Sequence, residues 1–123
     1  MSEAVEVVSR WHAAVNAGDT EAALALCTTD VAVGGPRGDG AGHELMRAWL
    51  QRSGILLQPQ EELVERDGRL VVHELARWRT TANAPARAPT DAPADTWVTF
   101  EVRDGLVSAV RRYQTADEVP AAG

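Results

Sequence analysis

Residues 9–33 read SRWHAAVNAGDTEAALALCTTDVAV, and their pattern is the most informative about the fold. Around its start, apolar residues recur at spacings of three and four, which is typical of the buried face of a helix. These residues are Val5, Val8, Trp11 (or His12) and Val15. We therefore expect a helix over 3–17, which Ser2 can cap and Gly18 ends.

The middle of the stretch predicts a tight corner between two helices. Asp19 is a good N-cap for a second helix over 20–28. Its inner face would carry Ala23, Leu24 and Cys27. A short strand at Asp30–Val33 then follows. A Gly-Asp corner between two helices indicates a helical hairpin at the start of the fold.

Downstream, residues 34–42 read GGPRGDGAG, with five Gly and one Pro in nine residues, and we expect a loop there. A third helix is predicted over 43–52. Its apolar face would consist of Met46, Trp49 and Leu50, and Gly54 would end it.

The second half of the chain reads as an antiparallel sheet. Segments 55–66 and 69–80 flank Asp67-Gly68, and segments 97–103 and 106–114 flank Asp104-Gly105. Asp-Gly between such segments is a strong signal for a hairpin. The Ala/Pro-rich residues 81–93 would be a mobile loop, and 115–123 a frayed tail. Helices on one side of an antiparallel sheet define an α+β fold, and 123 residues suit one domain, ordered over about 3–114.

Composition excludes several classes of protein. The formal net charge of −6 argues against nucleic acid as a partner. Cys27 is the only cysteine, so neither an internal disulfide nor a thiolate metal site is expected. The start MSEAVEVV does not resemble a signal peptide, and no apolar run is long enough to span a membrane. We expect a cytoplasmic protein without a membrane partner.

The order of these elements resembles the nuclear transport factor 2-like superfamily, and within it the SnoaL-like group. The resemblance is carried by residues 9–33, by GHELMRAWL at 42–50 and by TFEVRDGLVSAVRRY at 99–113. It implies a cone-shaped fold, a cystatin-like roll in which three helices pack on a curved sheet around a pocket. It also implies a homodimer formed through the sheet face, and an activity such as that of a cyclase, isomerase or hydrolase.

The same resemblance argues against steroid isomerisation. Ketosteroid isomerases of this fold use an Asp before a Pro, and here Gly35 precedes Pro36. They also use a Tyr and a protonated Asp, and the matching places hold Trp11 and Val98 (or Thr99). The Asp–Arg–Asp set of the epoxide hydrolases has no match that we can find.

The segment 69–79 leaves two alternatives for a catalytic residue. Its more apolar face carries Leu70, Val72, Glu74, Ala76 and Trp78. With that face inward, Glu74 is a carboxylate among hydrophobic residues and a candidate general acid or base, unless it pairs with an Arg. With the opposite register, His73 and Arg77 enter the pocket, and the ligand would be an anion.

Other residues are weaker candidates for a site. Asp39 is a further candidate acid or base near the expected mouth of the pocket, as is His43, although a turn Asp and a helix-start His explain both. Arg112 would face inward, where it could pair with Glu74 or bind a carboxylate. The predicted ligand-binding residues are Trp11, Val33, Trp49, Val98, Phe100, Val110 and Arg112, and each of the apolar ones has core packing as its alternative.

Three functions stay open at this point. The first is a cofactor-free protein that binds an apolar small molecule in a hydrophobic pocket. The second is a SnoaL-like cyclase, isomerase or hydrolase that uses acid–base chemistry at Glu74, Asp39 or His73. The third is a non-catalytic interaction module with Trp97 or Trp78 exposed on its sheet. No spacing of the three His residues suggests a metal site.

Overall fold

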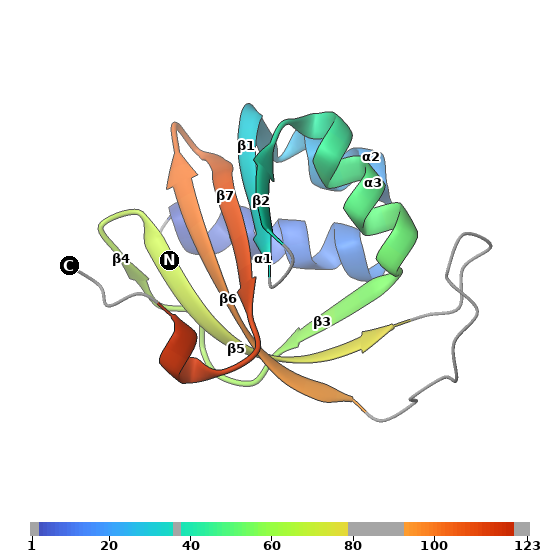
Figure 1. Cartoon of the computed structure of the whole chain (residues 1–123). Coiled ribbons are helices and arrows are strands. Elements are labelled where there is room, and N and C mark those ends of the chain that lie inside the picture. Colours follow the sequence, from blue (N-terminus) through green and yellow to red (C-terminus); the bar gives the residue numbers. More distant parts are fainter. Residues whose placement is uncertain (1–2, 36–37, 79–92, 120–123) are drawn as a thin grey trace.

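The computed structural model describes residues 3–35, 38–78 and 93–119, in which three α-helices pack against one curved sheet (Figure 1). The helices are α1 (Glu3–Asn16), α2 (Thr20–Ala25) and α3 (His43–Ser53). The strands are β1 (Cys27–Gly35), β2 (Gly38–Ala41), β3 (Ile55–Pro59), β4 (Glu65–Arg66), β5 (Arg69–Trp78), β6 (Ala94–Arg103) and β7 (Leu106–Tyr113). A 3₁₀ turn, η1 (Ala116–Glu118), follows. The α+β fold class is confirmed.

The predicted corner between the first two helices is confirmed. Gly18 has a φ of 76°, the left-handed conformation that ends α1. The Asp19 side chain accepts a hydrogen bond from the backbone N–H of Ala22 over 3.1 Å, which caps α2. The prediction was wrong about the length of α2, because β1 begins at Cys27 and uses residues that we assigned to the helix.

The sheet is mixed rather than wholly antiparallel. Its strand order is β2-β1-β7-β6-β5-β3, with β4 paired to β5 off this path. The β1–β7 pair is parallel, with Val33 opposite Val110, while the other pairs are antiparallel. The chain's first and last long strands therefore lie side by side in the middle of the sheet. Local hairpin signals predict neighbours in sequence and gave no information on this pairing.

Residues 34–42 do not form only a loop. Gly38–Ala41 is strand β2, which pairs with β1 so that Gly34 lies opposite Asp39. Our prediction rested on the low strand propensity of glycine, but pairing with β1 overrides it. The small residues also allow close approach, because a Cβ at Gly34 would collide with the Asp39 carboxylate.

Segment 55–66 is interrupted, contrary to the single strand that we predicted. β3 ends at Pro59, and β4 is only Glu65–Arg66, although both pair with β5. The backbone N–H of Gln60 still donates to the carbonyl of His73 over 2.9 Å. The tail is also more ordered than expected up to Val119, since Glu118 accepts hydrogen bonds from the N–H groups of Gln114 and Thr115. The predicted Ser2 cap and nearly all of loop 81–93 lie outside the described residues.

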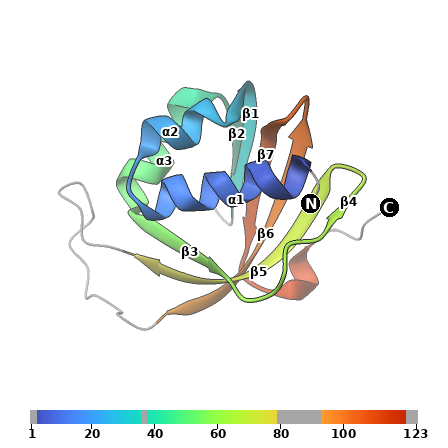
Figure 2. The same ribbon diagram turned by 180° about the vertical axis from the view of Figure 1, so that it is seen from behind.

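Helix α1 lies across the concave face of the sheet, as Figure 2 shows from behind. Its inner face buries Val8, Trp11 and Val15, at 0%, 0% and 5% exposure. At the end of the helix, Asn16 donates to the carbonyl of Leu57 and accepts from its N–H, both over 2.8 Å. Asn16 thus uses the backbone groups on the open side of edge strand β3 and fixes α1 to that edge. No described helix is long and apolar enough to cross a membrane.

Both Asp-Gly hairpins form as predicted. Asp67 and Gly68 have φ values of 54° and 77°, and Asp104 and Gly105 have 55° and 77°. Positive φ at both central residues is the conformation that the twist of a two-residue hairpin requires.

We expect Gly68→Ala to destabilise the protein by about 1 kcal/mol, because an L side chain is strained at this φ. The added Cβ would also lie 3.2 Å from the carbonyl oxygen of Val102. A loss of this size lowers Tm by about 4 °C, measurable by circular dichroism. Gly35→Ala is the matched control, because a Cβ there meets nothing within 4 Å. Equal losses in the two variants would contradict the turn argument.

Candidate functional site

Strand β5 turns Glu74 into the interior. On its inner face Leu70, Val72, Glu74 and Ala76 are 0%, 3%, 0% and 0% exposed. The structure therefore has the first of the two registers that we considered. Glu74 is the only carboxylate in the described part of the chain that is buried in this way. Burial of a carboxyl group among hydrophobic residues requires a strong partner.

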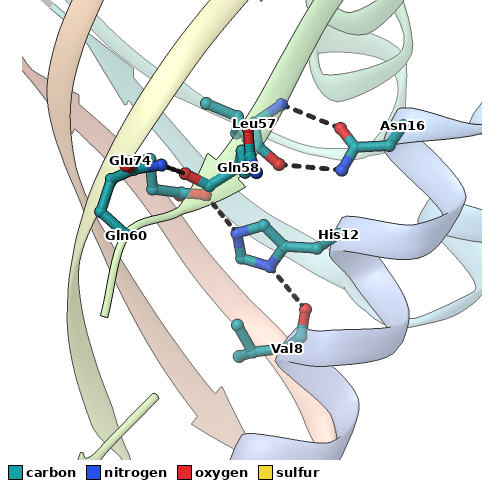
Figure 3. Close-up of polar contacts among 7 residues, drawn as sticks. All are labelled: Val8, His12, Asn16, Leu57, Gln58, Gln60 and Glu74. Atoms are coloured by element: carbon teal, nitrogen blue, oxygen red, sulfur yellow. Dashed lines mark hydrogen bonds and ion pairs between the residues drawn. The ribbon is translucent and has the colours of Figure 1, made fainter. Parts of the chain in front are cut away.

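That partner is His12 of α1 (Figure 3). His12 Nε2 lies 2.6 Å from Glu74 Oε1, and both side chains are buried, at 6% and 0% exposure. The other ring nitrogen, Nδ1, lies 2.8 Å from the carbonyl oxygen of Val8. A carbonyl oxygen only accepts, so Nδ1 must carry a proton.

This geometry places one proton between the two side chains. Either the Glu74 carboxyl donates to a neutral imidazole, or an imidazolium donates from Nε2 to the Glu74 carboxylate. Both arrangements leave the pair with no net charge, which suits the apolar interior. The second carboxyl oxygen, Glu74 Oε2, is buried and has no hydrogen-bond partner among the described residues. It is therefore the oxygen of Glu74 whose capacity to accept a hydrogen bond is unused among the described residues.

Aromatic rings enclose the imidazole. The ring centroids of Trp11, His12 and Phe100 lie 5.2 to 5.4 Å from one another, and Trp11 and Phe100 are fully buried. These contacts hold the His12 ring in one orientation. Asn16, one helical turn after His12, fixes α1 to β3 through Leu57 (Figure 3). Helix α1 is thus held at two places, by the His12–Glu74 pair and by the hydrogen bonds of Asn16 to edge strand β3.

Our expectation that Arg112 could pair with Glu74 was wrong. No ion pair joins them within the described ranges, and His12 occupies that place. The Arg112 guanidinium instead lies over the Trp78 ring, with its carbon 5.5 Å from the ring centroid. His12 was not among the predicted catalytic residues. It lies four residues after Val8 and three before Val15, so its position on the inner stripe was readable from the sequence.

His73 lies on the outer face of the sheet, away from Glu74. Its Nε2 is 2.9 Å from Asp95, its Nδ1 is 3.9 Å from Glu61, and its ring stacks on Trp97 at 4.8 Å. The side chain is 28% exposed. Successive residues of a strand face opposite sides, so Glu74 and His73 cannot share a site. Arg77 is exposed and likewise does not enter the interior.

Asp39 is exposed on β2 and lies far from the pair in the fold. It lines a groove of about 540 Å³ together with Gly35, Arg111, Arg112, Tyr113 and Glu118. His43 begins α3, with Nε2 3.4 Å from the carbonyl oxygen of Cys27. The predicted acid–base candidates are thus divided among the interior, the groove and the outer face.

The predicted ligand-binding residues fall into two groups. Trp11, Val33, Val98, Phe100 and Val110 are all buried in the core, at 8% exposure or less. Trp49 and Arg112 are half-buried, and only Arg112 among the seven lines the groove. No group of three or more potential metal ligands occurs in the ranges that the structure describes.

We expect Glu74→Ala to lower the free energy of unfolding by about 3 kcal/mol, because it leaves His12 buried without a partner. Glu74→Gln should cost about 1 kcal/mol, since its amide can still donate to Nε2. Urea denaturation measures both. Glu101→Ala is the matched control, because its 2.9 Å ion pair with Arg111 is half exposed and should contribute little. If Glu74→Ala is as mild as Glu101→Ala, the buried pair is not a stabilising interaction.

Cys27 should be unreactive in the folded protein. Burial raises the pKa of its thiol from the ordinary 9.0 to about 12, so the nucleophilic thiolate is scarce at neutral pH. Its Sγ also donates to the carbonyl of Ala23 over 3.3 Å. The raised pKa contributes stability below pH 9, and this contribution is lost as the pH rises toward 12.

A thiol-reactive disulfide dye at pH 8 tests this. We expect slow labelling of the native protein and rapid labelling in urea. Ser9→Cys supplies an internal control, because position 9 is exposed and its thiol should react at once. Rapid labelling of two thiols in the native Ser9→Cys protein would contradict the burial of Cys27.

Comparisons with known proteins bear on the fold and the family of this chain. No curated protein matches the chain at a significant level. An NTF2-like protein of unknown function from Cytophaga hutchinsonii superposes with a TM-score of 0.76 at 11% identity, over 93% of this chain and 91% of that one. A proposed polyketide cyclase from Xanthomonas campestris gives 0.76 at 23% identity, over 94% and 93%. TerC, crystallised with polyporic acid, gives 0.72 at 22% identity, over 94% of each chain.

At these identities the superpositions establish a common fold and leave activity open. The sequence itself provides the family. The model of the SnoaL-like domain matches residues 8–110, a range that begins within α1, ends within β7 and contains both members of the buried pair. The chain belongs to the SnoaL-like domain family.

Proposed function

We propose that this protein binds an apolar small molecule in its cone and transfers protons on it through Glu74, which His12 positions. The observation that carries the proposal is the unpartnered, buried oxygen Oε2 of Glu74. An unsatisfied buried carboxyl oxygen costs about 1–3 kcal/mol, and a hydrogen-bonding group of a ligand would remove that cost. Buried polar atoms of native proteins are rarely left unpaired, so this oxygen requires an explanation, and a catalytic role supplies one.

The pair has the parts that acid–base catalysis requires. The Val8 carbonyl holds a proton on His12 Nδ1, which leaves Nε2 as the atom that shares its proton with Glu74 Oε1. When that proton is on His12, Glu74 is a carboxylate, and Oε2 can take a proton from an acidic C–H of the substrate. The C–H bond breaks, an O–H bond forms, and the electron pair stays on the substrate as an enolate. Return of the proton to another atom gives an isomer or drives a ring closure.

The side chains around the pair favour an apolar, conjugated substrate. The rings of Trp11 and Phe100 lie 5.4 and 5.2 Å from the His12 ring, and both are fully buried. Among the structural relatives are the proposed polyketide cyclase, TerC with polyporic acid, and the epoxide hydrolase/cyclase-like enzyme SalBIII. Their names support, for this chain, a cyclase, isomerase or hydrolase that acts on a polyketide-like ring system.

We also propose that the protein is a cytoplasmic homodimer that associates through the outer face of the sheet. It would work without a cofactor. Val71 is 46% exposed on that face, and Trp97 is half-buried beside it. The same two residues are what a non-catalytic interaction module would present. Loss of self-association in Val71→Glu, measured by sedimentation, would support the dimer.

Bicyclic aromatic ketones, such as 2-tetralone, test the chemistry without knowledge of the natural substrate. Ligands are first selected by a rise in Tm, and NMR in D₂O then follows exchange of the protons next to the ketone. We expect the wild type to accelerate exchange and Glu74→Gln to slow it about 100-fold while still binding the ketone. Glu101→Gln is the control, because it also removes a carboxylate but on the exposed side of β6.

The outcomes separate the three functions. Binding with no exchange leaves a binding protein. Exchange that is unchanged in Glu74→Gln removes the acid–base role of Glu74. Failure of every ketone to raise Tm counts against the small-molecule site itself.

A further inference from the structure

Arg112 has an unusual position for an arginine. On β7 it lies directly opposite Val98 of β6, which in turn lies opposite Val72 of β5. Directly opposed residues share a face of the sheet, so Arg112 belongs to the same inner face as the two buried valines and Glu74. The strand register therefore places the positive charge of Arg112 at the end of the row of side chains that begins with Val72 and Val98.

The guanidinium lacks the partners that a half-buried charge needs. It forms no ion pair with any described residue, and its Nε atom is buried without a hydrogen-bond partner there. Burial lowers the pKa of Arg112, because removal from water disfavours the charged form. The contact with the Trp78 ring at 5.5 Å offsets part of that cost and fixes the plane of the side chain.

Neighbouring charges do not neutralise it. Asp39 and Glu118 line the same groove as Arg112, but neither lies within ion-pair distance of the guanidinium. Glu118 is already used by the backbone N–H groups of Gln114 and Thr115. Arg111, the adjacent arginine, differs in that it pairs with Glu101 over 2.9 Å. The two consecutive arginines thus differ. Arg111 forms an ion pair, whereas Arg112 has no anionic partner among the described residues.

We propose that Arg112 binds the anionic group of the ligand, and that the natural ligand is an aromatic or polyketide-like organic acid whose carboxylate or enolate enters from the groove. Arginine suits this role because its planar fork can donate two parallel hydrogen bonds to a carboxylate. The inference rests on the proposed function, since the rest of the ligand is directed along the inner face toward Glu74.

The topology sets the size of such a ligand. β5 and β7 are separated by β6, so the strands that carry Glu74 and Arg112 are about 10 Å apart. A fused two-ring or three-ring acid is long enough to reach from an anchor at Arg112 to a proton-transfer group at Glu74, whereas a small acid such as acetate would reach only one of them.

A matched pair of ligands tests the anchor. 2-Naphthoate and 2-naphthamide have the same rings and differ in charge, and calorimetry gives their dissociation constants. We expect the wild type to bind the carboxylate at least about 10-fold more tightly. Arg112→Met keeps the length and the contact with Trp78, so it should remove this preference and leave amide binding unchanged. Arg77→Met is the matched control, because Arg77 is exposed and lies outside the groove, and this variant should retain the preference.

A second readout needs no activity. In protein labelled with ¹⁵N-arginine, the Nε–H resonance of Arg112, identified by its loss in Arg112→Met, should shift on titration with 2-naphthoate and stay fixed with the amide. Equal affinity of the wild type for acid and amide, or a preference that persists in Arg112→Met, overturns the anchor and leaves Glu74 chemistry standing. Glu74→Gln that keeps the acid preference but also keeps proton exchange overturns the proposed function and leaves the anchor standing.

Discussion

The 2.6 Å contact between His12 and Glu74 is the interaction on which the interior of this protein depends. A carboxyl group at 0% exposure has no water to solvate it, so its pairing must come from the protein. The pair satisfies that demand while carrying no net charge, and it joins residues that are 62 positions apart in the chain. It therefore ties the first helix to strand β5 through a hydrogen bond that tolerates little displacement.

The neighbouring contacts serve the same end. The Val8 carbonyl fixes the tautomer of His12, and the rings of Trp11 and Phe100 restrict its orientation. Asn16 holds the C-terminal end of α1, because its side chain forms with the backbone of Leu57 the two hydrogen bonds that a neighbouring strand would form. Each contact removes one freedom of the imidazole: its proton position, its rotation and the position of its helix. Such preorganisation is what proton transfer requires, and it is also what a buried structural pair requires, which is why only Glu74 Oε2 distinguishes the two roles.

The sequence predicted what is local and missed what is distant. Helix periodicity and the two Asp-Gly turns correctly gave the helices, the hairpins and the inward face of β5, because each depends on residues that are close in the chain. The parallel β1–β7 pair and strand β2 depend on contacts with other segments, which no local pattern records. The site shows the same division. Glu74 was found by its own strand pattern, whereas His12 acquires its meaning only from a partner on another element.

The buried pair and Arg112 each lack one partner. Glu74 has a proton-transfer partner but an oxygen without one, and Arg112 has an aromatic neighbour but no anion. Both lie on the inner face, and neither can satisfy the other, because two strand spacings and a row of valines separate them. In a protein selected for stability alone, apolar replacements of these groups would often be at least as favourable. A ligand with an anionic group at one end and an acidic C–H near the other would pair with both Arg112 and Glu74, and such a ligand explains why the two residues are separate.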